Sequence, residues 1–213
     1  MNRLFDRRKA RRTAFVDTFE FPSGVRHRFA LRHTDLTADD LGRVDAAARQ
    51  WFRLAARHPR ARLGMPSVVV DDLWHELVLD TQEYATFCRA AFGRFLHHVP
   101  DSPTGSPAEL ASRSRQLLAT LELARRDESC TADQLPSLFS VDQKLGIAGA
   151  RRYLADCGGR GQCHELRGTV CLRHLIDQGG SSSRNWDHDP AHRSPGVPPS
   201  SNGGGCGGCG GNG

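Results

Sequence analysis

One short segment combines residue types that could bind a metal ion or carry out acid–base chemistry. Residues 71–77 read DDLWHEL. A His-Glu pair on a helix is typical of zinc proteases only when a second His follows one turn later, because residues i and i+4 can share a metal. Here Leu79 occupies that position, and Gly168 occupies it after a second copy at residues 164–166. The sequence therefore excludes this protease signature at both places.

Acidic, histidine and aromatic residues around this segment form a candidate functional pocket. Its members are Asp71, Trp74, His75, Tyr84, His97 and His98. Asp71 lies one helical turn before His75, so the two side chains share a face. If the following helix continues to His98, a rise of ~1.5 Å per residue leaves His75 and His97 ~15 Å apart along the axis. This geometry favours a structural role, in which Asp71 hydrogen-bonds His75 within the core.

Two chemical alternatives stay open for this pocket. A metal site would use Asp71, His75, His97 and His98 as ligands. A hydrolase-type enzyme would use His75 as a general base that Asp71 orients. No nucleophile or phosphate-binding motif accompanies these residues. We therefore assign no catalytic residue, and the sequence favours a protein that is not an enzyme.

A second set of possible metal ligands lies toward the C-terminus. It consists of Cys157, Cys163, His164, Cys171, His174, Cys206 and Cys209. Thiolates and imidazoles in this number suit tetrahedral zinc, which is the candidate cofactor. However, more than 30 residues separate His174 from the Cys206-x2-Cys209 pair, and closing such a loop costs free energy. Flexible sequence of biased composition is therefore favoured over metal capture.

The elements that must position these residues are mostly helices. Residues 37–58 have an apolar stripe at the helical period, with Thr37 as the N-cap. Two further helices are predicted over residues 68–80 and over residues 81–98, the second capped by Thr81. Upstream, residues 15–31 fit either a hairpin or a short helix capped by Ser23, and the helix is favoured.

Two capping boxes predict further helix starts. Residues 106–109 (Ser-Pro-Ala-Glu) place Pro at the first helical position, and the helix ends near residues 125–126. Residues 140–143 (Ser-Val-Asp-Gln) are the second box and predict a short helix that Gly146 stops. Residues 150–155 are expected to add one more helical turn.

Composition narrows the class of protein. The net charge is +5, and residues 1–12 hold six basic residues, which predicts a solvated arm more than a nucleic-acid-binding one. The longest aliphatic run, residues 68–70, is far shorter than the ~18 residues of a membrane span. No apolar stretch near the N-terminus marks a secretory signal. We therefore expect a cytoplasmic protein without a membrane span.

A pattern over residues 65–100 resembles a known family. The residues that carry it are Val70-Asp71, Trp74-His75, Tyr84, Phe87-Cys88, Phe92-Gly93, His97-His98 and Pro100. They resemble the glycine-rich domain-containing proteins (the GRDP-like or DUF1399 group) of bacterial type. Residues 135–157 are similar to the segment before the Gly/Cys-rich tail of bacterial members. Plant members commonly read Trp-His-x-His, whereas this chain has Leu77 at the second His, and the resemblance implies no established activity.

Together these patterns predict a mainly α protein with a single compact multi-helix domain over residues 13–157. A basic disordered arm over residues 1–12 precedes the domain. A largely disordered tail over residues 158–213, first Cys/His-rich and then Gly/Ser-rich, follows it. The resemblance favours a non-enzymatic interaction or scaffold module with a protein partner. Metal binding is the alternative function.

Overall fold

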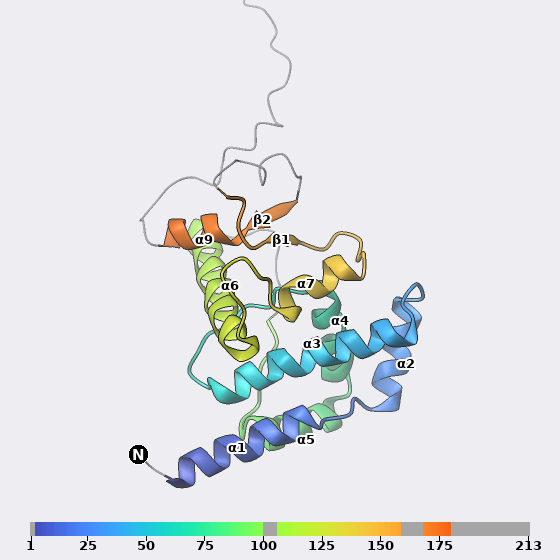
Figure 1. Cartoon of the computed structure of the whole chain (residues 1–213). Coiled ribbons are helices and arrows are strands. Elements are labelled where there is room, and N and C mark those ends of the chain that lie inside the picture. The colour runs from blue at the N-terminus through green and yellow to red at the C-terminus, as the bar shows by residue number, and fades with distance from the viewer. Residues whose placement is uncertain (1–2, 100–105, 159–167, 180–213) are drawn as a thin grey trace, which may run out of the picture.

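Helices dominate the architecture. The computed structural model describes residues 3–99, 106–158 and 168–179, and Figure 1 shows their arrangement. These ranges contain eight helices and one two-stranded sheet, which confirms the predicted mainly α domain. The elements are α1 (Arg3–Asp17), α2 (Ser23–Arg32), α3 (Ala38–Arg57), α4 (Val68–Leu79), α5 (Thr81–Ala91), α6 (Pro107–Glu128), α7 (Ser137–Lys144), β1 (Arg152–Leu154), β2 (Thr169–Cys171) and α9 (Leu172–Gly179). Within the same ranges, no helix has both the length and the apolar character that a membrane crossing requires.

Helix α3 lies at the centre of the core. It packs against α1, α4, α6 and α7, and Figure 1 shows it crossing the middle of the molecule. The ring of Trp51 meets that of Trp74 in α4 with centroids 4.5 Å apart, and Phe52 meets Phe87 in α5 at 4.9 Å. All four rings are buried, and burying a large apolar side chain stabilises a fold by about 1.5–3 kcal/mol. The core therefore holds α4 firmly against α3 and α5.

Two helix starts follow the predicted capping residues, and the predicted cap Thr81 is wrong, because the N-cap of α5 is Asp80 and makes no side-chain cap hydrogen bond. Thr37 caps α3, and residues 106–109 form the capping box of α6 with Pro at its first position. The helical alternative for residues 15–31 is correct in that α2 begins at Ser23. The N-cap of α2 is, however, Pro22. Local hydrogen bonding by short polar side chains therefore predicts the starts of α3 and α6 but not the N-caps of α2 and α5.

Two predicted elements after α6 are wrong. Helix α7 begins at Ser137, so residues 140–143 lie inside it and do not form its cap. The carboxylate of Asp142 instead accepts a hydrogen bond from the first turn of α4. Residues 152–154 form β1 and not a helical turn, because they pair in parallel with β2. Both errors come from contacts with distant segments, which a local pattern does not contain.

The ends of the domain also differ from the prediction. Residues 3–17 form α1 and not a disordered arm, because Val16 enters the core while Arg7, Arg8 and Arg11 before it stay exposed. At the other end, Leu172 and Leu175 of α9 join the main core. The domain therefore extends well beyond residue 157. Residues 180–213 of the predicted tail lie outside the described residues.

Candidate metal centre

Helix α4 carries the acidic and histidine residues of the site, and its first turn is held in place by two side chains. The hydroxyl of Ser67 accepts a hydrogen bond from the Val70 amide at 3.1 Å, as expected of a serine N-cap. The carboxylate of Asp142 accepts hydrogen bonds from the Val68 amide at 2.7 Å and from the Ser67 hydroxyl at 2.5 Å. Burial raises the pKa of Asp142, and these hydrogen bonds oppose the rise. The start of α4 is thereby fixed to α7.

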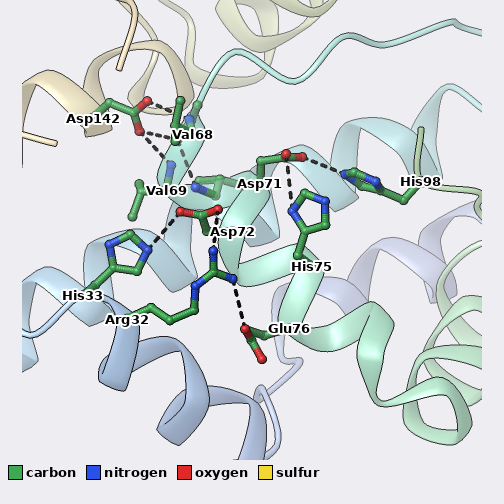
Figure 2. A network of polar contacts seen from close by, with 12 residues as sticks. Arg32, His33, Val68, Val69, Asp71, Asp72, His75, Glu76, His98 and Asp142 are labelled. Atoms are coloured by element: carbon green, nitrogen blue, oxygen red, sulfur yellow. Dashed lines mark hydrogen bonds and ion pairs between the residues drawn. The ribbon is translucent and has the colours of Figure 1, made fainter. Parts of the chain in front are cut away.

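One carboxylate on α4 is shared by two imidazoles. Asp71 Oδ1 lies 2.9 Å from His98 Nε2, and Asp71 Oδ2 lies 3.5 Å from His75 Nδ1. Figure 2 shows both imidazole rings turned toward the Asp71 carboxylate. A ligand atom from each of the three residues lies within 4.8 Å of the other two. We refer to Asp71, His75 and His98 as the Asp71 centre.

His98 reaches this centre because α5 ends early. The prediction of a helix through residue 98 is wrong: α5 stops at Ala91, and Gly93 adopts a φ of 67°. This left-handed conformation costs glycine little, whereas other residues rarely adopt it. The following residues, 94–99, which we call the return segment, come back toward α4. The separation of ~15 Å, which assumed an unbroken helix, therefore does not apply to His98.

The return segment is tied to the core by two buried side chains. Tyr84 donates a hydrogen bond from its hydroxyl to the Leu96 carbonyl, and Trp74 Nε1 donates to the Tyr84 oxygen at 3.1 Å. Burial raises the pKa of Tyr84, so its hydroxyl remains a donor. The Trp74 ring also meets the His98 ring edge-on, with centroids 4.3 Å apart. Trp74 and Tyr84 therefore position His98.

A pocket of about 520 Å³ lies beside the Asp71 centre. Asp71, Trp74, His97 and His98 are among the residues that line it, whereas His75 and Tyr84 are not. His97 is exposed and lies outside the three-residue cluster. The side chain of His75 is 35% exposed and that of His98 only 7%. The cluster therefore sits at the edge of the pocket and is open to solvent on the His75 side.

The charged groups around the pocket are mostly basic. Its lining includes Arg62, Arg94 and Arg151, and Asp71 is the one carboxylate among the lining residues. His58 also lines it, and burial together with nearby cationic groups, Lys9 first among them, lowers its pKa. A volume of this size falls in the range of small-molecule sites. The pocket thus suits a small anionic ligand.

The opposite face of α4 carries two carboxylates with a different set of partners. Glu76 Oε2 accepts a hydrogen bond from Arg28 Nε at 2.8 Å, and its Oε1 lies 3.2 Å from Arg32 Nη1. Asp72 pairs with His33 Nε2 at 3.0 Å. Arg28 and Arg32 lie in α2 and His33 directly follows it, and Figure 2 shows the Arg32 and His33 contacts. We call Asp72 and Glu76 the α2 face of α4.

The geometry of the Asp71 centre matches that of a metal site. With metal–ligand distances of ~2.1 Å, adjacent ligand atoms lie ~3.0 Å apart in an octahedral site and ~3.4 Å apart in a tetrahedral one. The two Asp71 distances, 2.9 Å from Oδ1 to His98 and 3.5 Å from Oδ2 to His75, involve different carboxylate oxygens and lie close to this range. Two imidazoles and one carboxylate are a ligand set that catalytic zinc and non-haem iron sites use. The three residues thus fit a divalent transition metal and leave coordination positions for other ligands.

Comparison with models of protein families places most of the chain in a family. Residues 11–175 match the UCP032817-like family. The chain belongs to this family. The matched range includes the Asp71 centre and the walls of its pocket, so the site lies in the part of the chain that the UCP032817-like family shares. No curated protein and no solved structure matches the chain.

The UCP032817-like range also contains part of the C-terminal ligand set. The structure brings together Cys157, Cys171 and His174, with ligand atoms all within 4.8 Å of one another. We call these three residues the Cys/His cluster. The other predicted ligands, Cys163, His164, Cys206 and Cys209, lie outside the described residues.

Sequence reasoning missed two features of the site, for different reasons. Gly93 follows the apolar pattern of α5, and a glycine at that place is a recognised signal for a helix end. The signal for the return segment is therefore present in the sequence. The three arginines of the pocket, Arg62, Arg94 and Arg151, follow different helices and give no common signal. Only the fold brings them together.

Proposed function

We propose that this protein binds a divalent transition-metal ion through Asp71, His75 and His98, and that the ion binds a small anionic ligand in the adjacent pocket. The observation that carries the proposal is the convergence of one carboxylate and two imidazoles within 4.8 Å. Zinc or ferrous iron is the expected ion, because both use this ligand set. Metal binding is the alternative function that the sequence leaves open, and the convergence of these three residues supports it.

Rigid support of the ligands strengthens the proposal. Metal affinity depends on the groups that orient the ligands as well as on the ligands themselves. Asp71 lies in the first turn of a helix whose start is fixed by Ser67 and Asp142. His98 is held by the hydrogen bond of Tyr84 to the return segment. Both ends of the site are therefore positioned before any ion binds.

The pocket suggests what the ion would act on. Three lining arginines against one carboxylate give this surface a positive charge, and the bound ion would add to it. Guanidinium groups recognise carboxylates and phosphates through paired hydrogen bonds. We therefore expect a small carboxylate or phosphate ester as the ligand class. The GRDP-like resemblance, the interaction module and the hydrolase with His75 as general base stay predictions.

Metal content of the untagged full-length chain is the first test. We would strip the protein with a chelator, reload it with cobalt(II) and record both stoichiometry and the visible spectrum. The Asp71 centre supplies only nitrogen and oxygen ligands, so its cobalt should give ligand-field bands without thiolate-to-metal charge transfer. The variants Asp71→Asn and His98→Ala should each lose these ligand-field bands. Any charge-transfer bands from cobalt bound to cysteine thiolates elsewhere in the chain should remain.

Asp72→Asn is the matched control, because it changes the neighbouring carboxylate on the other face of α4. It should retain the nitrogen/oxygen cobalt component in full. If Asp71→Asn binds as much cobalt as the wild type with the same spectrum, the proposal is wrong. The same conclusion follows if the unmodified chain takes up no ion beyond those bound by thiolates.

A further inference from the structure

The Cys/His cluster lies where three short elements meet. Cys171 is the last residue of β2, and its register partner in β1 is Leu154. Cys157 follows three residues after that partner. His174 lies in the first turn of α9, which begins at Leu172 directly after Cys171. The parallel pairing of β1 with β2 therefore brings together ligands that are distant in sequence.

The distances within the cluster fit tetrahedral coordination. Cys157 Sγ lies 3.7 Å from His174 Nε2, and all three ligand atoms lie within 4.8 Å of one another. With a zinc–sulfur distance of ~2.3 Å and a zinc–nitrogen distance of ~2.05 Å, a tetrahedral angle separates sulfur from nitrogen by ~3.6 Å. The observed separation needs almost no adjustment.

The surroundings of the cluster are those of a built site. Both cysteines are buried, at 4% and 6% exposure, and pack against Leu154. Next to the ligands, Arg173 Nη1 pairs with Asp156 Oδ2 at 2.7 Å, which joins the residue before Cys157 to the residue before His174. A second hydrogen bond, from the Gly158 amide to Asp156 Oδ1 at 2.8 Å, holds the turn after Cys157. These contacts orient two of the three ligands.

The elements around the cluster need such support. The sheet consists of only two strands with three paired residues each, and an isolated two-stranded sheet is marginally stable at best. Helix α9 has eight residues, well below the ~12–15 at which an isolated helix becomes stable. Leu172 and Leu175 dock α9 on the main core and Tyr153 docks β1 there, whereas Arg152 is exposed and Leu154, Thr169 and Val170 are only partly buried. A metal that joins β1, β2 and α9 would stabilise all three, because metal-binding energy is folding energy in small units.

We propose that Cys157, Cys171 and His174 bind a structural zinc ion that fastens β1, β2 and α9 to the helical domain. This site is separate in residues and in ligand chemistry from the Asp71 centre, and it does not depend on the function proposed above. Its two thiolates make it a soft, zinc-selective set, in contrast to the nitrogen and oxygen ligands on α4. The three residues supply three of the four positions of a tetrahedral ion.

The test uses the full-length chain, loaded with zinc or cobalt(II), and its Cys157→Ser and Cys171→Ser variants. Each variant should lose one metal equivalent per chain together with the thiolate-to-cobalt charge-transfer band. Two controls apply: Cys130→Ser changes a cysteine remote from the cluster, and Cys206→Ser/Cys209→Ser removes the C-terminal pair. Both should keep the band. An Asp71→Asn variant should also keep it, which separates this proposal from the first.

Since a cysteine variant can also fail through misfolding, a second measurement uses the unmodified protein. Removing zinc with a chelator should increase amide hydrogen exchange in β1, β2 and α9 and leave α3 and α4 protected. Re-adding zinc should restore the protection. The proposal is overturned if Cys157→Ser retains the thiolate band, if only the Cys206→Ser/Cys209→Ser variant loses it, or if mass spectrometry shows Cys157 and Cys171 joined as a disulfide.

Discussion

The two faces of α4 carry similar residues in different surroundings. On the α2 face, Glu76 is bound by Arg28 and Arg32, and Asp72 by His33 and by Arg32 at 3.8 Å. On the pocket face, Asp71 meets only imidazoles among its ion-pair partners in the described residues. On the α2 face, each carboxylate therefore has at least one arginine partner, which carries a permanent positive charge. The pocket face leaves one carboxylate and two histidines without an arginine or lysine partner within the part of the chain that the structure describes.

This difference separates a structural role from a chemical one. Guanidinium groups keep their charge at all relevant pH values and occupy carboxylate lone pairs with fixed hydrogen bonds. Imidazole nitrogens, in contrast, can release a proton and coordinate a metal. Burial alone would raise the pKa of Glu76, but the hydrogen bonds and charges of Arg28 and Arg32 outweigh it and hold the pKa below the usual range. The α2 face therefore joins two helices, while the pocket face keeps donor atoms available.

The largest effect should come from removing the shared carboxylate. Asp71→Asn retains the size of the side chain but removes the charge and one ligand oxygen. We expect metal affinity to fall by more than ~100-fold, beyond the 10–100-fold typical of residues that only support a ligand. The free energy of unfolding of the metal-free protein should change by less than ~1 kcal/mol, because Asp71 is partly exposed. Competition with a chromophoric chelator and urea unfolding measure the two quantities.

The reverse result is expected on the α2 face. Glu76→Gln leaves Arg28 and Arg32 without their carboxylate and should lower the free energy of unfolding by about 1–2 kcal/mol. Larger losses are expected only for fully buried ion pairs, and both arginines are partly exposed. Metal affinity should stay within ~3-fold of wild type, which corresponds to a change in binding free energy of at most ~0.6 kcal/mol. If Glu76→Gln lost metal affinity without losing stability, the division between the two faces would be wrong.

Acid should abolish the contribution of Glu76 in a predictable direction. Its pKa is lower in the folded protein than in the unfolded chain, so the stabilisation is fully present above the unfolded value of about 4.3 and is lost as the pH falls through the folded value. The difference in unfolding free energy between wild type and Glu76→Gln should therefore shrink toward zero in acid. Urea titrations of metal-free protein over a pH series measure it. A difference that is constant with pH would show that the charge of Glu76 contributes nothing.

The sequence predicts the helices of this protein better than it predicts the site. Thr37 and residues 106–109 mark helix starts through hydrogen bonds to the next turn, and the structure has those starts. The relation of Asp71 to His75 likewise follows from helical periodicity alone. By contrast, His98 joins them only because the chain reverses after Gly93. Contacts within one helical turn can therefore be predicted from the sequence, whereas contacts between distant segments can be predicted only when the end of each helix is known.

The same distinction explains the error at the C-terminal end of the domain. Residues 150–155 lack a strong pattern, and three residues of β-strand are too few to show alternation. Their conformation is decided by pairing with β2, which lies beyond residues 159–167 in sequence. That pairing also creates the Cys/His cluster. A ligand list read from spacing alone contains Cys157, Cys171 and His174, but cannot separate them from the other four candidates.

The smallest effect tests whether the support of His98 belongs to the pocket face. Tyr84→Phe removes the hydroxyl that donates to the Leu96 carbonyl and accepts from Trp74. Stability should fall by about 1 kcal/mol, the usual value of one hydrogen bond, and affinity for the Asp71-centre metal by ~10-fold. Tyr153→Phe is a matched control, because its buried hydroxyl donates to the Pro66 carbonyl at 3.1 Å, away from the return segment. Tyr153→Phe should lower stability by a similar amount and leave the metal affinity of the Asp71 centre unchanged. If both variants lost metal affinity equally, Tyr84 would act through the general stability of the fold and not through the position of His98.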